Sequence, residues 1–322
     1  MQNNIKISGI FYSIMAGIIA GITAFVPEFM FVTAIFSIAF YIEACVMLPY
    51  KFYAIAPLVT IFTALFFTFS PYLLLLCLII YVPSSIACAY FIKNNESLKQ
   101  VSLAGIFAGC AGIFSLIIAF IRIRGGAFSI TAAQIAFKPL FDSYKAFWSD
   151  AISTYDRMSP DLSENLRNNI AELTKVIKEV YLPLIPGLII VAVSLAVFLA
   201  VLMAKRHLYK RGFDVSFMGR FRDFVPSKAA AIMLFLSMLV SFFTEGNIGI
   251  AFSNLSVVLT AIFFAAGLAL IAFWLNRLNV SKIIRTFCFI GILVLIGLLP
   301  SFSSLISGAG AVAALFDLRK NK

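Results

Sequence analysis

Long apolar runs recur along almost the whole chain of 322 residues, and they constrain its fold more than any other feature. A run of about 20 apolar residues is long enough to cross the hydrocarbon core of a membrane as an α-helix. The short alternating segments of a transmembrane barrel are absent from the sequence. Apolar residues make up 62% of the chain and charged residues 12%, far from the balance of a soluble domain. The sequence therefore predicts an all-α, polytopic membrane protein.

Proline residues mark the boundaries between the apolar runs, because proline cannot continue a helix. Pro27, Pro49, Pro71, Pro226 and Pro300 each stand at such a boundary. This punctuation predicts a transmembrane helical bundle of about ten spans. The expected spans are residues 8–26, 29–47, 52–69, 71–92, 101–123, 183–204, 227–244, 252–275, 283–299 and 301–317. The alternative for the last of them, which is rich in small residues, is a segment that re-enters the membrane without crossing it.

Residues 125–182 form the only sizeable polar region between the runs. Apolar residues spaced three or four apart predict one amphipathic helix from Pro139 and a second from the Ser159-Pro160 capping pair. We expect three domains: an N-terminal membrane bundle (1–124), an extracytoplasmic helical hairpin (125–182) and a C-terminal membrane bundle (183–322). The alternative for the first, aromatic helix is a position in the plane of the membrane interface.

Basic residues fall on alternate sides of the expected spans. With the N-terminus inside, 17 of the 25 Lys and Arg residues lie on the inner side, and the short outer loops hold none. Cytoplasmic loops carry such an excess, so both termini are expected in the cytoplasm, with the first apolar run kept as an uncleaved span. Topology accounts for the net charge of +11, and we expect no nucleic-acid partner.

The most basic stretch, residues 205–228, is expected to be the central cytoplasmic loop. It holds seven Lys or Arg residues, two Asp residues and the only histidine, His207. Anionic membrane lipids are the expected partners of its basic side chains, and a docking site for a cytoplasmic protein is the alternative. The residues expected to make these contacts are Lys205, Arg206, Lys210, Arg211, Arg220 and Arg222.

A few polar residues lie inside the expected spans. Glu43 is the only acidic one well inside a span, and an intramembrane carboxylate is a functional candidate because its burial is costly. The alternative is a Glu at the interface that snorkels or forms an ion pair. Pro83 indicates either a broken helix of the kind that builds transport sites or a simple kink. The residues expected to bind a ligand are Glu43, Tyr81, Ser84, Ser85 and Asn254.

Small residues form a ridge along the first expected span, one at every fourth position. The ridge consists of Gly9, Ser13, Gly17 and Gly21. Such a ridge allows another helix to approach closely, either within this chain or from a membrane-protein partner.

The sequence offers no metal, cofactor or catalytic motif. The five cysteines, Cys45, Cys77, Cys88, Cys110 and Cys288, all lie in apolar runs without paired spacing, so we expect free thiols. The chain has one histidine, so no second histidine can act as the base that activates a nucleophile. No glycine-rich phosphate-binding loop is present. We therefore expect that the protein is not an enzyme.

Several motifs in the second half have a familiar layout. Pro183 and Pro186 precede a span, Lys210-Arg211-Gly212 forms a basic turn, and Phe217, Phe221, Phe224 and Pro226 precede the next span. Gly267-Leu268-Ala269 and Leu315-Phe316-Asp317-Leu318-Arg319 follow. This layout resembles the YybS-like family of predicted bacterial membrane proteins of unknown function, above all its proteobacterial branch. The resemblance implies the bacterial cytoplasmic (inner) membrane and transfers no site residue.

A more distant likeness concerns the first five spans, which resemble the substrate-binding components of energy-coupling-factor vitamin transporters. Two functional hypotheses follow. The first is a transport-related protein that binds a small molecule in a polar cavity faced by Glu43. The second is a non-catalytic scaffold or assembly partner in the cell envelope, suggested by the polar hairpin and the basic loop.

Overall fold

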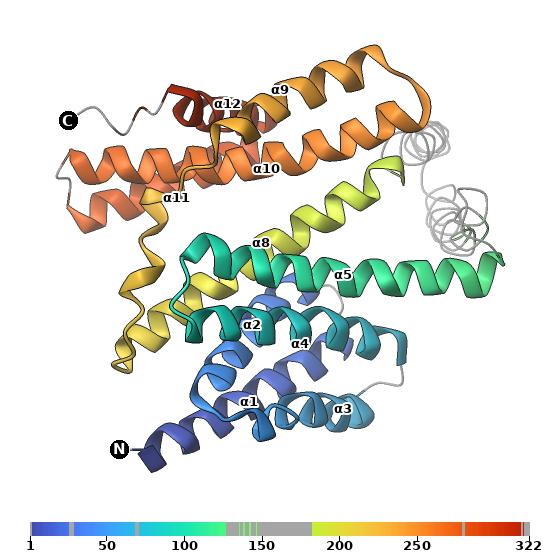
Figure 1. Ribbon diagram of the computed structural model, residues 1–322, viewed down its shortest axis with the longest axis vertical. Coiled ribbons are helices and arrows are strands. Elements are labelled where there is room, and N and C mark those ends of the chain that lie inside the picture. The colour runs from blue at the N-terminus through green and yellow to red at the C-terminus, as the bar shows by residue number, and fades with distance from the viewer. Residues whose placement is uncertain are drawn as a thin grey trace, which may run out of the picture. The chain divides into compact units, whose positions relative to one another are not determined.

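A computed structural model describes residues 2–25, 29–67, 71–126, 182–278 and 281–316, with a few isolated positions besides. Every regular element in these ranges is helical, which confirms the all-α prediction (Figure 1). The first half contains α1 (Gln2–Phe25), α2 (Met30–Met47), α3 (Ile55–Phe67), α4 (Pro71–Lys93) and α5 (Leu98–Gly125). The second half contains α8 (Leu182–Lys210), α9 (Lys228–Phe243), α10 (Gly246–Arg277), α11 (Lys282–Leu298) and α12 (Pro300–Phe316). The expected hairpin, 125–182, lies almost wholly outside the described residues.

Each expected span coincides with one of these helices, but length separates them into two classes. Five helical stretches are long and apolar enough to cross a membrane: Ile5–Thr23, Met30–Met47, Leu98–Gly125, Pro183–Lys210 and Gly246–Arg277. A bent pair, Ser216–Asp223 with Lys228–Phe243, makes a sixth candidate. Other apolar stretches, such as α3 with its 13 residues, are short. A helix of that length rises about 20 Å, less than the hydrocarbon thickness of about 30 Å. The described chain is therefore a multi-pass membrane protein with five or six candidate spans, and ten spans are not confirmed.

The chain divides into two compact units, residues 1–109 together with 186–322, and residues 110–185. In the first of these, α1 packs against α2 and α3, and α2 packs against α4. The small-residue ridge of α1 makes these contacts. A Cβ added at Gly17 would lie 2.6 Å from the Ala56 carbonyl oxygen, and one at Gly21 would lie 2.6 Å from Cβ of Thr63. Ser13 is fully buried. The ridge is thus occupied by α3 and the end of α2.

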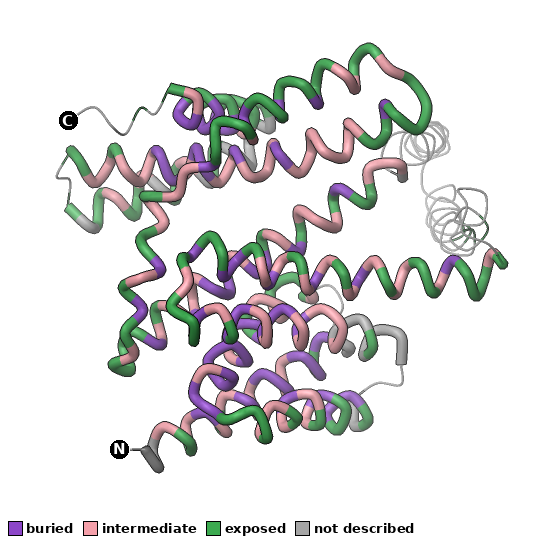
Figure 2. The backbone as a smooth tube through the Cα atoms, viewed as in Figure 1, coloured by how far each residue is buried: buried purple, intermediate pink, exposed green. Residues whose placement is uncertain are grey.

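A second packed group joins α10 with α9 and α12. Phe263 and Ala311 are completely buried at its centre. A Cβ added at Gly310 would lie 2.1 Å from the Phe263 carbonyl oxygen, and one at Gly267 equally close to that of Ile306. The two backbones can approach this closely only because glycine lacks a side chain. Figure 2 shows the buried residues in purple along α10 and within the group of α1, α2 and α4.

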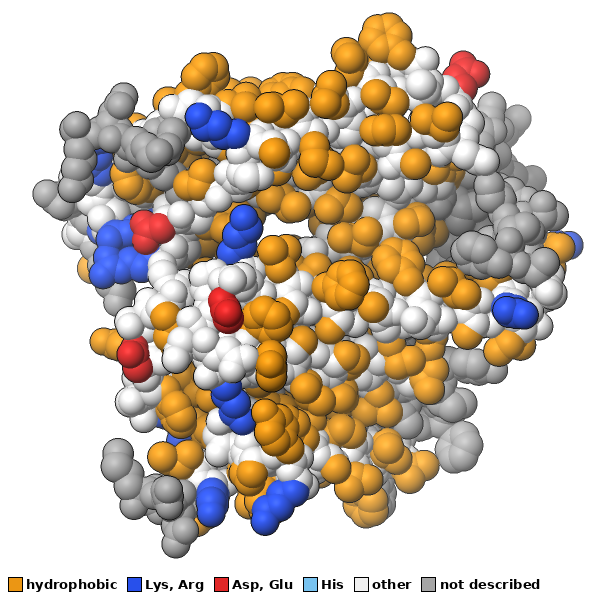
Figure 3. All heavy atoms as spheres, viewed as in Figure 1, with side chains coloured by type: hydrophobic (Ala, Val, Ile, Leu, Met, Phe, Trp, Pro, Cys, Tyr) orange, Lys and Arg blue, Asp and Glu red, His pale blue; other side chains and the backbone are white. Residues whose placement is uncertain are grey.

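Large apolar side chains remain on the outside. Leu58, Phe107 and Phe242 are each more than 60% exposed, and hydrophobic atoms cover much of the visible face in Figure 3. Contiguous apolar surface of this extent is unusual for a soluble monomer and is the surface that lipid chains contact in a membrane protein.

Candidate functional site

Glu43 lies near the C-terminal end of α2 and is completely buried. The end of α2 is buried on all sides: Ile42, Ala44 and Cys45, its neighbours in the chain, are also at or near zero exposure. A carboxylate in such surroundings is costly unless a partner satisfies it. The Glu43 side chain does not itself reach the surface of the protein.

The partner of Glu43 is His207, which lies in the last turn of α8. Nδ1 of His207 is 3.0 Å from Oε1 of Glu43. The His207 side chain is 34% exposed, whereas that of Glu43 is fully buried. The imidazole therefore connects a buried carboxyl group with the outside of the protein.

Aromatic rings flank this contact. The Phe40 ring stacks on Tyr12 of α1, with centroids 5.5 Å apart and planes at 21°. Phe40 also stacks on His207, with centroids 6.4 Å apart and planes at 24°. Three near-parallel rings from α1, α2 and α8 thus fix the plane of the imidazole beside Glu43.

Arg211, the residue after α8, attaches the end of that helix to α1. Its Nη1 donates to Oγ of Ser8 at 2.9 Å, and its Nη2 donates to Oη of Tyr12 at 2.6 Å. The guanidinium also lies over the Tyr12 ring, 4.8 Å from the centroid. The end of α8 is therefore attached to α1 through Arg211 and to α2 through the contact of His207 with Glu43.

The second carboxyl oxygen, Oε2 of Glu43, is buried and has no hydrogen-bond partner among the described residues. Buried polar atoms normally have a partner, and an exception points to a water, an ion or a proton at that atom. No group of three metal-ligating side chains occurs in the described part of the chain. A proton shared with His207 is the species that this pair of groups binds most readily.

The predicted ligand residues of α4 lie in a different environment. Oη of Tyr81 is 2.5 Å from Oγ1 of Thr60, and Oγ of Ser85 donates to the Ile38 carbonyl at 3.2 Å. Oγ of Ser84 is buried where α4 meets Gly109 of α5. The helix continues through Pro83 without ending. The first two groups join α4 to α3 and α2, and Oγ of Ser84 has no hydrogen-bond partner among the described residues.

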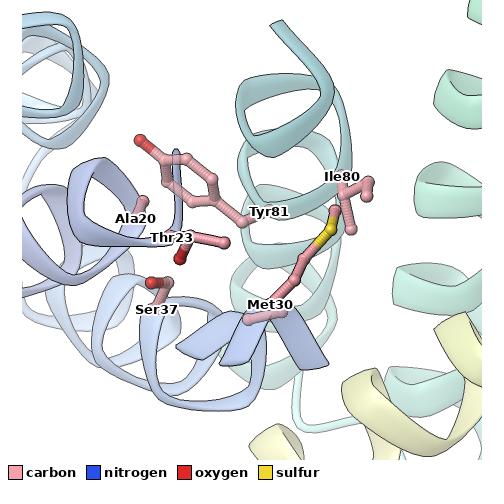
Figure 4. A pocket seen from close by; sticks show the side chains of 7 residues that line it. Ala20, Thr23, Met30, Ser37, Ile80 and Tyr81 are labelled. Carbon is pink, nitrogen blue, oxygen red and sulfur yellow. The ribbon is translucent and has the colours of Figure 1, made fainter. Parts of the chain in front are cut away.

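A small cavity lies next to Tyr81, with a volume of about 20 Å³ (Figure 4). Its lining residues are Ala20, Thr23, Met30, Ala34, Ser37, Ile80 and Tyr81. Such a cavity has room for about one water molecule. Of the predicted ligand residues, Tyr81 lines it and Glu43 does not, so the structure does not gather the predicted set around one cavity.

Asn254 of α10 contacts α8. Its Oδ1 accepts a hydrogen bond from the Gly187 amide at 2.6 Å, and its Nδ2 donates to the Ile250 carbonyl at 2.9 Å. These contacts hold α10 against the start of α8, and none of them involves Glu43.

The basic stretch 205–228 is folded. Its short 3-10 helices η4 (Ser216–Met218) and η5 (Phe221–Asp223) place Met218 in the interior and the ring of Phe221 against Phe198, 5.8 Å away. Lys205 donates to the Gly219 carbonyl. Among the predicted lipid-contact residues, Arg222 has its Nε 3.8 Å from Oδ1 of Asp223. The exposed members of this set are Arg206, Lys210, Arg211 and Arg220.

Sequence reasoning missed the pairing of Glu43 with His207. It singled out both residues separately, as the acid inside a span and as the only histidine, but treated the histidine as part of the loop. The signal available in the sequence was that both are scarce. With one acid well inside an expected span and one histidine in the chain, each is the natural partner of the other.

A family model described as predicted membrane protein (DUF2232) matches residues 13–311. No curated protein and no solved structure matches the chain. The match covers nearly the whole chain and includes Glu43, His207 and Arg211. The YybS-like resemblance and the likeness to energy-coupling-factor components stay predictions.

Proposed function

We propose that this chain, which belongs to the DUF2232 family of predicted membrane proteins, is a non-enzymatic transport protein that couples proton binding to the movement of a small solute. The observation that carries the proposal is Glu43: a carboxyl group buried in a candidate span, with one oxygen on His207 and the other without a described partner. Ionisable groups inside membrane helices are rare and recur in proton relays and transport pathways.

The geometry supports a proton path of two steps. Histidine gains and loses a proton near neutral pH, and it can take up a proton at one ring nitrogen and release one from the other. A proton from water binds Nε2 on the exposed side of His207, and Nδ1 passes its own proton to Oε1 of Glu43. The carboxyl group becomes neutral, and the imidazole returns to a neutral form with the proton on the other nitrogen.

In this proposal, the binding site for the solute forms in a conformation other than the described one. The cavity beside Tyr81 holds about one water molecule, which is too small for a metabolite. Neutralising Glu43 weakens its contact with His207. The end of α8 then separates from α2, and a site opens between them.

We also propose that the protein resides in a bacterial cytoplasmic membrane with both termini in the cytoplasm. The distribution of its basic residues supports this orientation, because 17 of 25 fall on one side of the expected spans. His207 would then exchange protons with the cytoplasm.

The test uses the full chain reconstituted in liposomes that enclose a pH-sensitive dye. Gradients of amino acids, vitamins and nucleosides are applied one by one, and the internal pH is followed. A solute that moves protons in the wild-type protein is then applied to Glu43→Gln, which removes the ionisable group but keeps its size. Glu245→Gln is the matched control, because Glu245 is an exposed acid before α10.

We expect solute-dependent proton flux in the wild-type protein and in the Glu245→Gln variant, and none with Glu43→Gln. Equal flux with Glu43→Gln would show that Glu43 is not the proton site. Failure of every solute in the panel to move protons in the wild-type protein would overturn the transport proposal.

A further inference from the structure

Three hydrogen-bond donors meet on the surface where α8 ends beside α1. Arg211 donates to the hydroxyl oxygens of Ser8 and Tyr12, so those hydroxyl groups act there as acceptors. Their own hydrogens remain available, and among the described residues no acceptor receives them. Arg211 likewise has no carboxylate within ion-pair distance in the described part of the chain. The group therefore offers several donors and one positive charge to a ligand from outside.

This arrangement suits a phosphate group. A guanidinium presents its N–H groups in a planar fork that matches two oxygens of a phosphate, and bonds to a charged acceptor are stronger than bonds between neutral groups. The Tyr12 ring, 4.8 Å from the guanidinium carbon, fixes the plane of that fork before any ligand binds. A neutral ligand would leave the charge of Arg211 uncompensated.

The positions of Ser8 and Arg211 along their helices indicate which kind of phosphate compound the three side chains would meet. Ser8 lies in the first turn of the candidate span Ile5–Thr23, and Arg211 follows the last residue of the candidate span Pro183–Lys210. Both positions are at the end of a hydrophobic segment, where lipid head groups begin.

The neighbouring surface has the apolar character that a lipid needs. Ile7 and Phe11, which precede Ser8 and Tyr12 by one residue on α1, are 65% and 55% exposed. Lys210 is exposed next to Arg211 and adds positive charge. A ligand with an anionic head and hydrocarbon chains would contact the polar group and the apolar surface together.

We propose that Ser8, Tyr12 and Arg211 form a binding site for the phosphate of an anionic membrane phospholipid. The lipid bridges α1 and α8 and reinforces the contact that the side chains already make. The site adjoins the proton site, because Tyr12 stacks on Phe40 and Phe40 stacks on His207. Neither Ser8 nor Tyr12 forms a hydrogen bond with Glu43 or His207.

The experiment titrates the detergent-purified full chain with phosphatidylglycerol and follows the bound fraction by native mass spectrometry. Phosphatidylcholine and inorganic phosphate are titrated in parallel. Arg211→Gln removes the charge and the fork. The double variant Ser8→Ala/Tyr12→Phe removes both hydroxyl groups and keeps the charge of Arg211. Arg277→Gln is the matched control, because Arg277 is an exposed arginine that lies over an aromatic ring, that of Trp274, at the end of another candidate span.

We expect Arg211→Gln to weaken phosphatidylglycerol binding at least tenfold. The double variant should weaken it more than fivefold, since one hydrogen bond corresponds to roughly a fivefold change in affinity. Arg277→Gln should stay within about twofold of the wild-type protein, a change below that of one hydrogen bond. Thermal unfolding in detergent verifies that each variant is folded.

Three outcomes would overturn the proposal. Equal weakening by Arg211→Gln and Arg277→Gln would mean general attraction to arginine side chains at the ends of the spans. Equal affinity for phosphatidylcholine would mean that the anionic head is not recognised. Inorganic phosphate that competes with the lipid at the same concentration would identify the ligand as a free anion.

Discussion

Oε1 of Glu43 lies 3.0 Å from Nδ1 of His207, although 164 residues separate the two in the chain. One partner is fully buried and the other is about one third exposed. This asymmetry decides which substitution is more damaging. A side chain that reaches water can replace a lost partner with solvent, and a buried one cannot.

Replacing His207 with alanine should destabilise the protein more than replacing Glu43 with glutamine. The first change leaves the Glu43 carboxyl group buried with neither oxygen paired, at a cost of about 2 to 3 kcal/mol. The second keeps an oxygen or an N–H group facing Nδ1 of His207 and should cost about 1 kcal/mol. Thermal unfolding of the purified variants in detergent measures both. A greater loss with Glu43→Gln would contradict the asymmetry.

The crossing of α10 and α12 should not tolerate a methyl group at Gly310. A Cβ there would lie 2.1 Å from the Phe263 carbonyl oxygen, and backbone atoms cannot move aside as a side chain can. Gly310→Ala should therefore cost at least about 3 kcal/mol. Two residues earlier on the same helix, Gly308 has no atom within 4 Å of an added Cβ, so Gly308→Ala is the control and should cost nothing. Equal unfolding temperatures for the two variants would refute the close crossing.

Along the ridge of α1, the cost of an added methyl group should depend on what it meets. A Cβ at Gly17 would lie 2.6 Å from the Ala56 carbonyl oxygen, whereas one at Gly9 would lie 2.7 Å from Cγ of the Leu48 side chain. Leu48 can change rotamer, so Gly9→Ala should cost about 1 kcal/mol and Gly17→Ala about 2 to 3 kcal/mol. The ranking is read from the midpoints of thermal unfolding, and the reverse order would count against this packing of α1 on α3.

The pH dependence of the basic stretch should follow Asp214. Its carboxylate accepts a hydrogen bond from the Ser216 amide at 3.0 Å, and this bond lowers the pKa of Asp214 below the ordinary value of an aspartate. Because the folded pKa is the lower one, the bond contributes fully above the ordinary pKa of aspartate and is lost as the pH falls through the lowered value. Hydrogen exchange at the Ser216 amide, corrected for its intrinsic pH dependence, should accelerate in that acid range.

The control for this prediction is Asp223, which contacts Arg222. Asp214→Ala should accelerate exchange at Ser216 already at neutral pH, and Asp223→Ala should not. If neither the acid pH nor Asp214→Ala changes the exchange rate at Ser216, the Asp214 carboxylate does not protect the Ser216 amide.

The helices were predictable from the sequence because their signals are local. Two such signals are the apolar run between Gly246 and Arg277 and the prolines at positions 71 and 300. Each of them affects only residues within a few helical turns. The span count was less predictable. The short run of α3 has the composition of a span but only 13 helical residues, and composition does not say whether such a helix crosses.

The candidate site was predictable only in part. Glu43 was identified because an acid inside an apolar run is costly, but Tyr81 and Asn254 were grouped with it on polarity alone. In the structure, Tyr81 contacts Thr60 and Asn254 contacts Gly187, which are neighbours that no local pattern reveals.

The sequence by itself determined that this is an all-α, multi-pass membrane protein with one acid inside the end of one span and one histidine near the end of another. Only the tertiary structure decided that these two side chains meet, because their contact depends on how α2 and α8 pack across 164 residues of chain. Hydrophobicity and helix propensity act between near neighbours, so they determine each helix. The partner of a buried charge is determined by the packing of all the helices around it.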